Sequence, residues 1–95
     1  MAKYVCDFDQ VKANGENLCQ AATDLSSDIN TYSSGINSSL STWSGDAATA
    51  FNESNSKQVE TSLANAEYIH SLGEFVKEAA QSIENLENEL ASLTI

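Results

Sequence analysis

Apolar side chains recur along the chain in alternating steps of three and four residues, and the pattern is interrupted once near the middle. This period places the apolar residues on one side of a helix, so it predicts helices from about residue 8 to 40 and from about 46 to 92. The interruption, Ser41-Thr-Trp-Ser-Gly-Asp46, is composed mainly of turn-forming residues, and the chain contains no proline that would break a helix. The predicted fold is all-α, with one domain over residues 1–95 and a turn at 41–46.

Each predicted helix carries an apolar stripe that is wider than the seam between two helices. Its large side chains are those of Phe8, Val11, Leu18, Leu25, Ile29, Tyr32, Ile36, Phe51, Val59, Ile69, Leu72, Val76, Ile83, Leu86 and Leu90. Because the connection is short, the helices must form an antiparallel hairpin, a rod with no third layer to cover the remaining apolar surface. Two hairpins packed face to face make a four-helix bundle, so we expect a dimer.

Small residues interrupt the stripe at Gly15, Ala22, Ala66 and Ala80, and Gly73 adjoins it. Glycine inside a helix costs about 1 kcal/mol relative to alanine, so its presence calls for a reason. We favour close approach of the two helix backbones. The competing interpretation is that the glycines are tolerated in helices with length to spare.

Polar residues at the predicted helix starts have the spacing of capping residues. Asp7 and Gln10 match a capping box, in which the carboxylate accepts a backbone N–H and the amide side chain reaches back. Ser44 or Asp46 could cap the second helix, and the sequence does not decide between them.

The charge of the chain is strongly negative and excludes several classes of partner. Fourteen acidic residues face four basic ones, which gives a formal net charge of -10 that repels the phosphates of nucleic acids and anionic membranes. No stretch approaches the roughly 18 apolar residues of a membrane-spanning helix, and the start has no hydrophobic signal-peptide core. We therefore expect no nucleic-acid binding, no membrane span and no export by the general secretory route.

The sequence offers no pattern for catalysis, a cofactor or a metal. His70 is the only histidine, and the carboxylates within a helical turn of it are those of Glu67 and Glu74, fewer ligands than a zinc site requires. Acidic residues spaced largely by seven along the second helix are typical of a solvated face. They are Glu53, Glu60, Glu67, Glu74 and Glu78. We expect a protein that is not an enzyme and holds no cofactor or metal.

The two cysteines lie thirteen residues apart, at Cys6 and Cys19. A helix between them would separate them by about 20 Å, which disfavours a disulfide within the chain. Cys19 is expected to pack as a small apolar residue and Cys6 to lie near a frayed end. A disulfide between two chains is left open.

The turn contains the only tryptophan, Trp43, two residues before Gly45. A large aromatic ring prefers burial, and glycine takes backbone angles that are closed to other residues, so together they predict a structured turn. Trp43 either plugs the open end of the hairpin or is recognised by a partner, and the two roles are compatible.

Trp43-Ser44-Gly45, followed by Asp46-Ala-Ala-Thr-Ala-Phe51 and placed between two proline-free helices, resembles the WXG family of small type VII secretion substrates, the ESAT-six-like helical hairpin proteins. The resemblance covers essentially the whole chain. It implies a hairpin that dimerises with itself or with a related partner. It also implies export, without a cleaved signal peptide, through a membrane-embedded secretion ATPase, so that the protein is cytoplasmic before export and secreted afterwards.

In that family the W-x-G turn of one subunit lies beside a C-terminal Y-x-x-x-[D/E] element of the other, and only the first half carries over here, to Trp43 and Gly45. The residues four places after the tyrosines are not acidic. For Tyr4, Tyr32 and Tyr68 they are Phe8, Ile36 and Leu72. We therefore hypothesise that a partner supplies the missing element, for instance the N-terminal helical domain of a larger secreted toxin.

The expected function is that of a non-enzymatic protein of the type VII pathway, acting as a dimeric substrate, partner or targeting factor, with Trp43 and Gly45 as its recognition motif. The alternative is a cytoplasmic helical adaptor or structural coiled coil in which Trp43 only packs.

Overall fold

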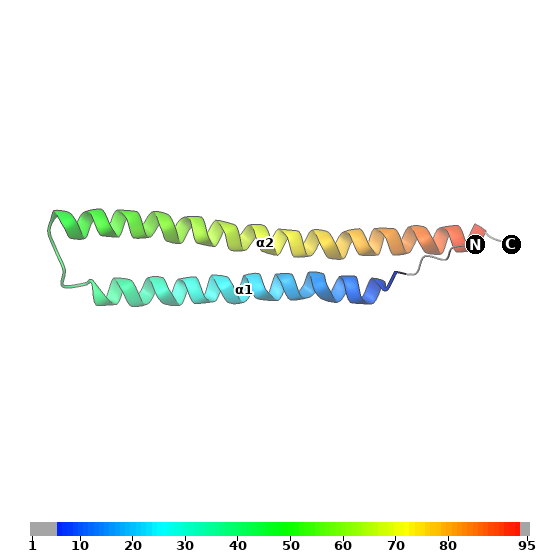
Figure 1. The fold of residues 1–95 in the computed structure, drawn as a ribbon, viewed down its shortest axis with the longest axis horizontal. Helices are drawn as coiled ribbons and strands as arrows, with labels where there is room; N and C mark the ends of the chain where they lie inside the picture. Colours follow the sequence, from blue (N-terminus) through cyan, green and yellow to red (C-terminus); the bar gives the residue numbers. More distant parts are fainter. Residues whose placement is uncertain (1–5, 94–95) are drawn as a thin grey trace.

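The structure, a computed structural model, describes residues 6–93 and contains two helices there, α1 (Phe8–Ser39) and α2 (Asp46–Leu93). The helices lie side by side and antiparallel, and they form a rod with extents of 77 × 19 × 16 Å (Figure 1). An α-helix rises about 1.5 Å per residue, so α2 alone spans nearly the whole rod. The predicted all-helical hairpin is confirmed, and the helix ends lie within a residue of the predicted ones.

The two helices differ in length, with 32 residues in α1 and 48 in α2. Away from the connection, α2 extends past the start of α1 (Figure 1). Near this end of the rod, Lys12 Nζ of α1 lies 2.6 Å from Glu84 Oε1 of α2. The final turns of α2 therefore have no part of α1 beside them.

Helix α1 begins as the sequence predicts, with one difference in its cap. Asp7 is the N-cap residue, and its Oδ1 accepts a hydrogen bond from the backbone N–H of Gln10 at 3.0 Å. The reciprocal half of the predicted capping box is wrong, because the Gln10 amide donates to Asn14 Oδ1 at 3.2 Å instead. Asn14 lies one turn further along the helix, so the Gln10 side chain extends along α1 and does not reach back to the backbone N–H of Asp7.

The connection between the helices comprises residues 40–45. The backbone N–H of Trp43 donates to the Leu40 carbonyl at 3.0 Å, which turns the chain after α1. Gly45 has φ +110°, a conformation that residues with a Cβ rarely adopt, and its carbonyl accepts the N–H of Thr49 at 3.0 Å. Gly45 therefore directly precedes α2, and neither Ser44 nor Asp46, the two predicted capping candidates, is the N-cap residue. Asp46 is the first helical residue, where a negative charge suits the helix dipole.

Small residues form the seam between the helices. We call Gly15, Ala22, Ala66, Gly73 and Ala80 the seam residues, and all five are buried. Cys19 and Ala48 are the other buried residues in the described helices. Since no large side chain separates the helices here, their backbones lie closer than two leucine-lined helices would allow.

Gly15 and Gly73 face each other across the seam. A Cβ atom added to Gly73 would lie 2.6 Å from the Gly15 carbonyl oxygen and 2.7 Å from Cys19 Sγ, and one added to Gly15 would lie 2.9 Å from the Gly73 carbonyl oxygen. Such distances are shorter than a real Cβ tolerates, so both positions require glycine. The preferred interpretation of these two glycines, close backbone approach, is confirmed. Gly35, in contrast, has no atom within 4 Å of its added Cβ, so no close approach requires a glycine there.

Within residues 6–93, neither helix has a stretch apolar enough and long enough to cross a membrane.

Candidate functional site

Trp43 and Phe51 form an aromatic pair at the end of the rod that carries the connection. Their ring centroids lie 5.9 Å apart with the planes inclined by 58°, a tilted geometry that aromatic pairs favour. Trp43 nevertheless remains 44% exposed and Phe51 41% exposed. The indole ring is therefore held against α2 without being buried, and its free face is accessible to another molecule.

None of the large apolar residues of the predicted stripe is fully buried, although their hydrophobicity suggests a core position. The half-buried members are Phe8, Val11, Leu18, Ile29, Ile36, Val59, Ile69 and Val76. The exposed members are Leu25, Tyr32, Phe51, Leu72, Ile83, Leu86 and Leu90. The seam residues approach so closely that side chains on either side of them are pushed outward, which leaves the large apolar groups at the edge of the helix pair.

Residues four places after each seam residue lie on one flank of the hairpin, which we call the polar flank. They are Cys19, Ser26, His70, Lys77 and Glu84. Contacts across the seam place them together, because Cys19 Sγ donates to the His70 carbonyl at 3.5 Å and Lys12 Nζ lies 2.6 Å from Glu84 Oε1.

Residues three places after each seam residue lie on the opposite flank, since a helix advances about 100° per residue. They are Leu18, Leu25, Ile69, Val76 and Ile83, and we call this the apolar flank. Leu25 is 39% exposed and Ile83 56%, and the neighbouring Leu72 is 44% exposed. The hairpin thus presents an apolar row from each helix on one side and charged groups on the other, which is the pattern of a surface that docks on a partner.

Lysines on the polar flank join the two helices. Lys77 Nζ lies 2.7 Å from Glu16 Oε2 and 3.3 Å from Glu74 Oε1, and the hydrogen bond to Glu16 raises the pKa of the Lys77 ammonium above its usual value. Of the acidic residues predicted to form a solvated face, Glu74 pairs with Lys77 within α2 and also lies 3.5 Å from Cys19 Sγ of α1. These pairs are partly exposed and contribute modestly to stability.

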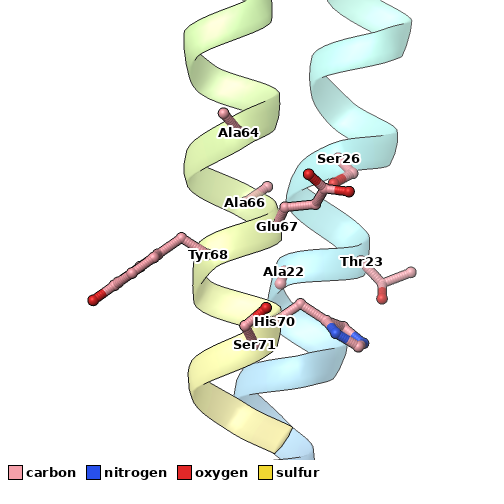
Figure 2. A pocket seen from close by; sticks show the side chains of 9 residues that line it. All are labelled: Ala22, Thr23, Ser26, Ala64, Ala66, Glu67, Tyr68, His70 and Ser71. Carbon is pink, nitrogen blue, oxygen red and sulfur yellow. The ribbon is translucent and has the colours of Figure 1, made fainter.

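An open groove of about 710 Å³ runs along the seam beside this flank (Figure 2). Small side chains, Ala22 and Ala66, lie at the junction of the helices, while Glu67 and His70 reach from α2 towards α1. Tyr68 points away from the groove in Figure 2 and is 73% exposed. The groove is open and lacks the enclosing walls that a small-molecule pocket has.

Two side chains of the polar flank, Cys19 and His70, and the adjacent Glu74 place metal-ligating atoms close together. Cys19 comes from α1, and His70 and Glu74 come from successive turns of α2; their sulfur, nitrogen and oxygen ligand atoms all lie within 4.8 Å of one another. Cys19 Sγ donates to Glu74 Oε1 at 3.5 Å, and His70 Nε2 lies 4.0 Å from the same oxygen. Thiolate, imidazole and carboxylate are the ligand types that zinc takes in proteins.

The protonation of the cluster follows from its surroundings. Burial, followed by the hydrogen bond to Glu74, raises the pKa of the Cys19 thiol above its ordinary value. Hydrogen bonds from Lys77 and then from Cys19 lower the pKa of the Glu74 carboxyl. The thiol is therefore a proton donor to a charged carboxylate at neutral pH.

The same cluster is poorly suited to nucleophilic catalysis. A reactive cysteine is a partly exposed thiolate in an electropositive setting. Cys19 is 4% exposed and its pKa is raised, and its hydrogen bonds go to Glu74 and to the His70 backbone rather than to the imidazole. The arrangement resembles a set of ligands more than a nucleophile with its base.

Comparison with protein-family models, with curated proteins and with solved structures finds no match to this chain. Membership of the WXG family therefore stays a prediction from the Trp43-Ser44-Gly45 sequence and its helical context.

The proximity of Cys19 to His70 was missed by the sequence analysis, which counted ligands along a single helix. The signal was present in the predicted hairpin, because facing residues of antiparallel helices lie at similar distances from the turn, and Cys19 and His70 do so. The burial of Cys19 is as predicted. Cys6 is exposed and lies before the start of α1. Tyr4, the first of the three tyrosines tested for the export motif, lies outside the described residues.

Proposed function

We propose that this chain is a non-enzymatic, secreted protein of the type VII pathway that acts as a dimeric substrate, partner or targeting factor. The observation that carries the proposal is an accessible Trp43 in the connection of a helical hairpin, with Gly45 two residues later at φ +110°. This is the arrangement that the resemblance to the WXG family implies. The protein would be cytoplasmic before export and leave the cell without a cleaved signal peptide.

Dimerisation is supported by the apolar flank. On this flank Leu25 of α1 is 39% exposed and Ile83 of α2 is 56% exposed. The neighbouring Leu72 and Leu86 are 44% and 55% exposed. Since about half of each side chain is still exposed, covering it contributes roughly 1 kcal/mol per residue. A second copy placed on this flank completes a four-helix bundle with apolar rows from all four helices in its core. A related hairpin would bury the same rows in a heterodimer.

Recognition by the secretion ATPase is assigned to the connection. Phe51 fixes the indole of Trp43 by its tilted contact at 5.9 Å, so the ring is presented in a defined orientation. The Y-x-x-x-[D/E] element is absent at Tyr32 and Tyr68, which are followed four places later by Ile36 and Leu72. A partner that carries this element, such as the N-terminal helical domain of a toxin, would complete the export signal.

The test compares export of the wild-type protein with that of Trp43→Ala in a host that carries the secretion machinery, with and without an active ATPase. We expect wild-type protein in the medium only when the ATPase is active, and Trp43→Ala retained in the cells at a normal level. Thr42→Ala, a change at the neighbouring position of the connection, serves as the matched control and should be exported.

Two results would reject this proposal. Equal loss of Trp43→Ala from cells and medium would assign Trp43 a purely structural role. Wild-type protein found only in the cytosol, with candidate partners co-expressed and the ATPase active, would favour the alternative, a helical adaptor. Export of the wild-type protein without any partner would keep the pathway and remove only the hypothesis that a partner completes the signal.

A further inference from the structure

The cluster on the polar flank has features that the secretion proposal does not explain. Its three donors are of three chemical types and come from both helices, with Cys19 on α1 and with His70 and Glu74 on α2. The sulfur is at a fixed, buried position, whereas the imidazole is 46% exposed and the carboxylate 45% exposed. An exposed opening therefore leads to a buried soft donor.

We propose that Cys19, His70 and Glu74 form a binding site for a divalent transition metal, with Zn²⁺ as the ion that the ligand set fits best. Sulfur and nitrogen donors select zinc over magnesium and calcium, which prefer oxygen donors alone. Three protein ligands leave a fourth tetrahedral position, which water fills. The site does not depend on the proposed secretory function.

The distances suit a tetrahedral site after a small movement of one side chain. With bonds of about 2.0–2.3 Å, ligand atoms around zinc lie roughly 3.3–3.6 Å apart. Cys19 Sγ and Glu74 Oε1 are already 3.5 Å apart, His70 Nε2 is 4.0 Å from that oxygen, and the imidazole nitrogen and the sulfur lie within 4.8 Å of each other. The imidazole is the ligand that must move closer to the other two, and its 46% exposure leaves it room to do so.

The charges around the cluster also suit a dication. When the metal binds, Cys19 loses its proton to solvent and becomes a thiolate, beside the carboxylates of Glu74 and Glu16 and the ammonium of Lys77. These four groups then sum to two negative charges, which Zn²⁺ neutralises. Lys77 keeps its closer partner, Glu16 Oε2 at 2.7 Å, and so need not leave when the metal takes Glu74 Oε1.

The bound metal would join the helices at a point distant from the connection. Cys19 and His70 are 51 residues apart in the chain, so the metal would close a long loop that is open in the unfolded state. A ligand that binds only the folded state raises its stability in proportion to the logarithm of its concentration above Kd. The bound metal would therefore cross-link α1 and α2 and raise the free energy of unfolding of the hairpin.

The experiment titrates the reduced, tag-free full chain with Co²⁺ as a spectroscopic probe and then with Zn²⁺. We expect one Co²⁺ per chain, with the near-ultraviolet charge-transfer absorption of a thiolate ligand and the intense visible bands of tetrahedral cobalt, both lost when Zn²⁺ displaces it. Zn²⁺ should raise the melting temperature, and a chelator should reverse the rise.

Variants identify the ligands. Cys19→Ser should abolish the charge-transfer band, whereas Cys6→Ser, which removes the exposed thiol, should leave it unchanged. Loss of a supporting group around a metal typically weakens binding about 10- to 100-fold, so loss of the ligand in His70→Gln or Glu74→Gln should weaken Zn²⁺ binding by at least about that factor. Glu67→Gln, three residues before His70, is the control for a nearby carboxylate and should bind as the wild type does.

The proposal is overturned if the wild-type protein gives no charge-transfer band, if the band follows Cys6 instead of Cys19, or if His70→Gln and Glu74→Gln bind Zn²⁺ with wild-type affinity. Circular dichroism of each variant checks that the helices form. Should Cys19→Ser fail to fold, His70→Gln decides the outcome, because its side chain is half exposed and its replacement leaves the seam intact.

Discussion

Gly15 and Gly73 approach each other so closely that the carbonyl oxygen of Gly15 lies 2.6 Å from where a Cβ atom on Gly73 would stand. The atoms in the way include backbone oxygen and nitrogen, which cannot turn aside as the end of a flexible side chain can. The contact therefore sets how near the two helices come, and it accounts for the outward position of the larger apolar side chains.

Replacement of Gly73 by alanine should destabilise the hairpin. Overpacking costs about 1–3 kcal/mol and the gain in helix propensity returns up to about 1 kcal/mol, so we expect a net loss of about 1–2 kcal/mol in the free energy of unfolding. Gly35→Ala is the matched control, because nothing lies within 4 Å of its added Cβ, and it should stabilise α1 by about 0.5–1 kcal/mol. Urea unfolding followed by circular dichroism measures both changes in the free energy of unfolding. Equal changes would mean that the helices move apart at the seam without cost and that Gly73 is not required there.

Replacement of Gly45 by alanine tests the geometry of the connection. At φ +110° a residue with a Cβ is strained, so we expect the free energy of unfolding to fall by about 1–2 kcal/mol, although no atom lies within 4 Å of the added Cβ. The adjacent Ser44 does not have a positive φ, and Ser44→Ala should change stability little. Thermal unfolding of the two variants distinguishes strain at Gly45 from a general sensitivity of the connection.

The mass of the purified protein in solution tests the role of the apolar flank. Light scattering after gel filtration should give a dimer, with circular dichroism of the same peak showing a helical protein. Leu72→Glu and Ile83→Glu place charges on exposed apolar positions and should shift the equilibrium to monomer. Ser71→Glu, an exposed change beside the polar-flank groove, should leave the mass unchanged. A wild-type monomer that aggregates would indicate a different chain as the natural partner.

The two thiols should react at very different rates. Cys6 is exposed, whereas Cys19 is buried and its raised pKa leaves less of the reactive thiolate at neutral pH. With an aromatic disulfide reagent and no metal, we expect one fast equivalent per native chain and a second that appears only slowly, or at once in denaturant. Cys6→Ser should remove the fast phase; its persistence would show that the helices open readily around Cys19.

The sequence predicts the helices well because their limits have local causes. Asp7 supplies the N-cap of α1, Gly45 supplies the backbone angle before α2, and the absence of proline leaves the intervening segments free to be helical. Local patterns of this kind need no knowledge of what lies across the molecule.

Burial and the candidate metal ligands depend instead on the register between the helices. The apolar period marks Leu25 and Ile83 as strongly as it marks Ala22 and Ala80, but only the small residues are buried, since distance between the helices decides which side chains fit. Cys19 is likewise a candidate metal ligand only because His70 lies beside it on the other helix, and residue spacing along one helix cannot reveal that proximity.

The separation in sequence between paired residues increases steadily along the rod, and this has a kinetic consequence. Tyr32 contacts Asn55 across 23 residues, Cys19 contacts His70 across 51, and Lys12 contacts Glu84 across 72. Closing the nearer pairs first shortens the loop that each later pair must close, so folding that spreads from the connection is the entropically favoured route. The tight approach of the two glycines would then form late, and its loss would appear mainly as faster unfolding.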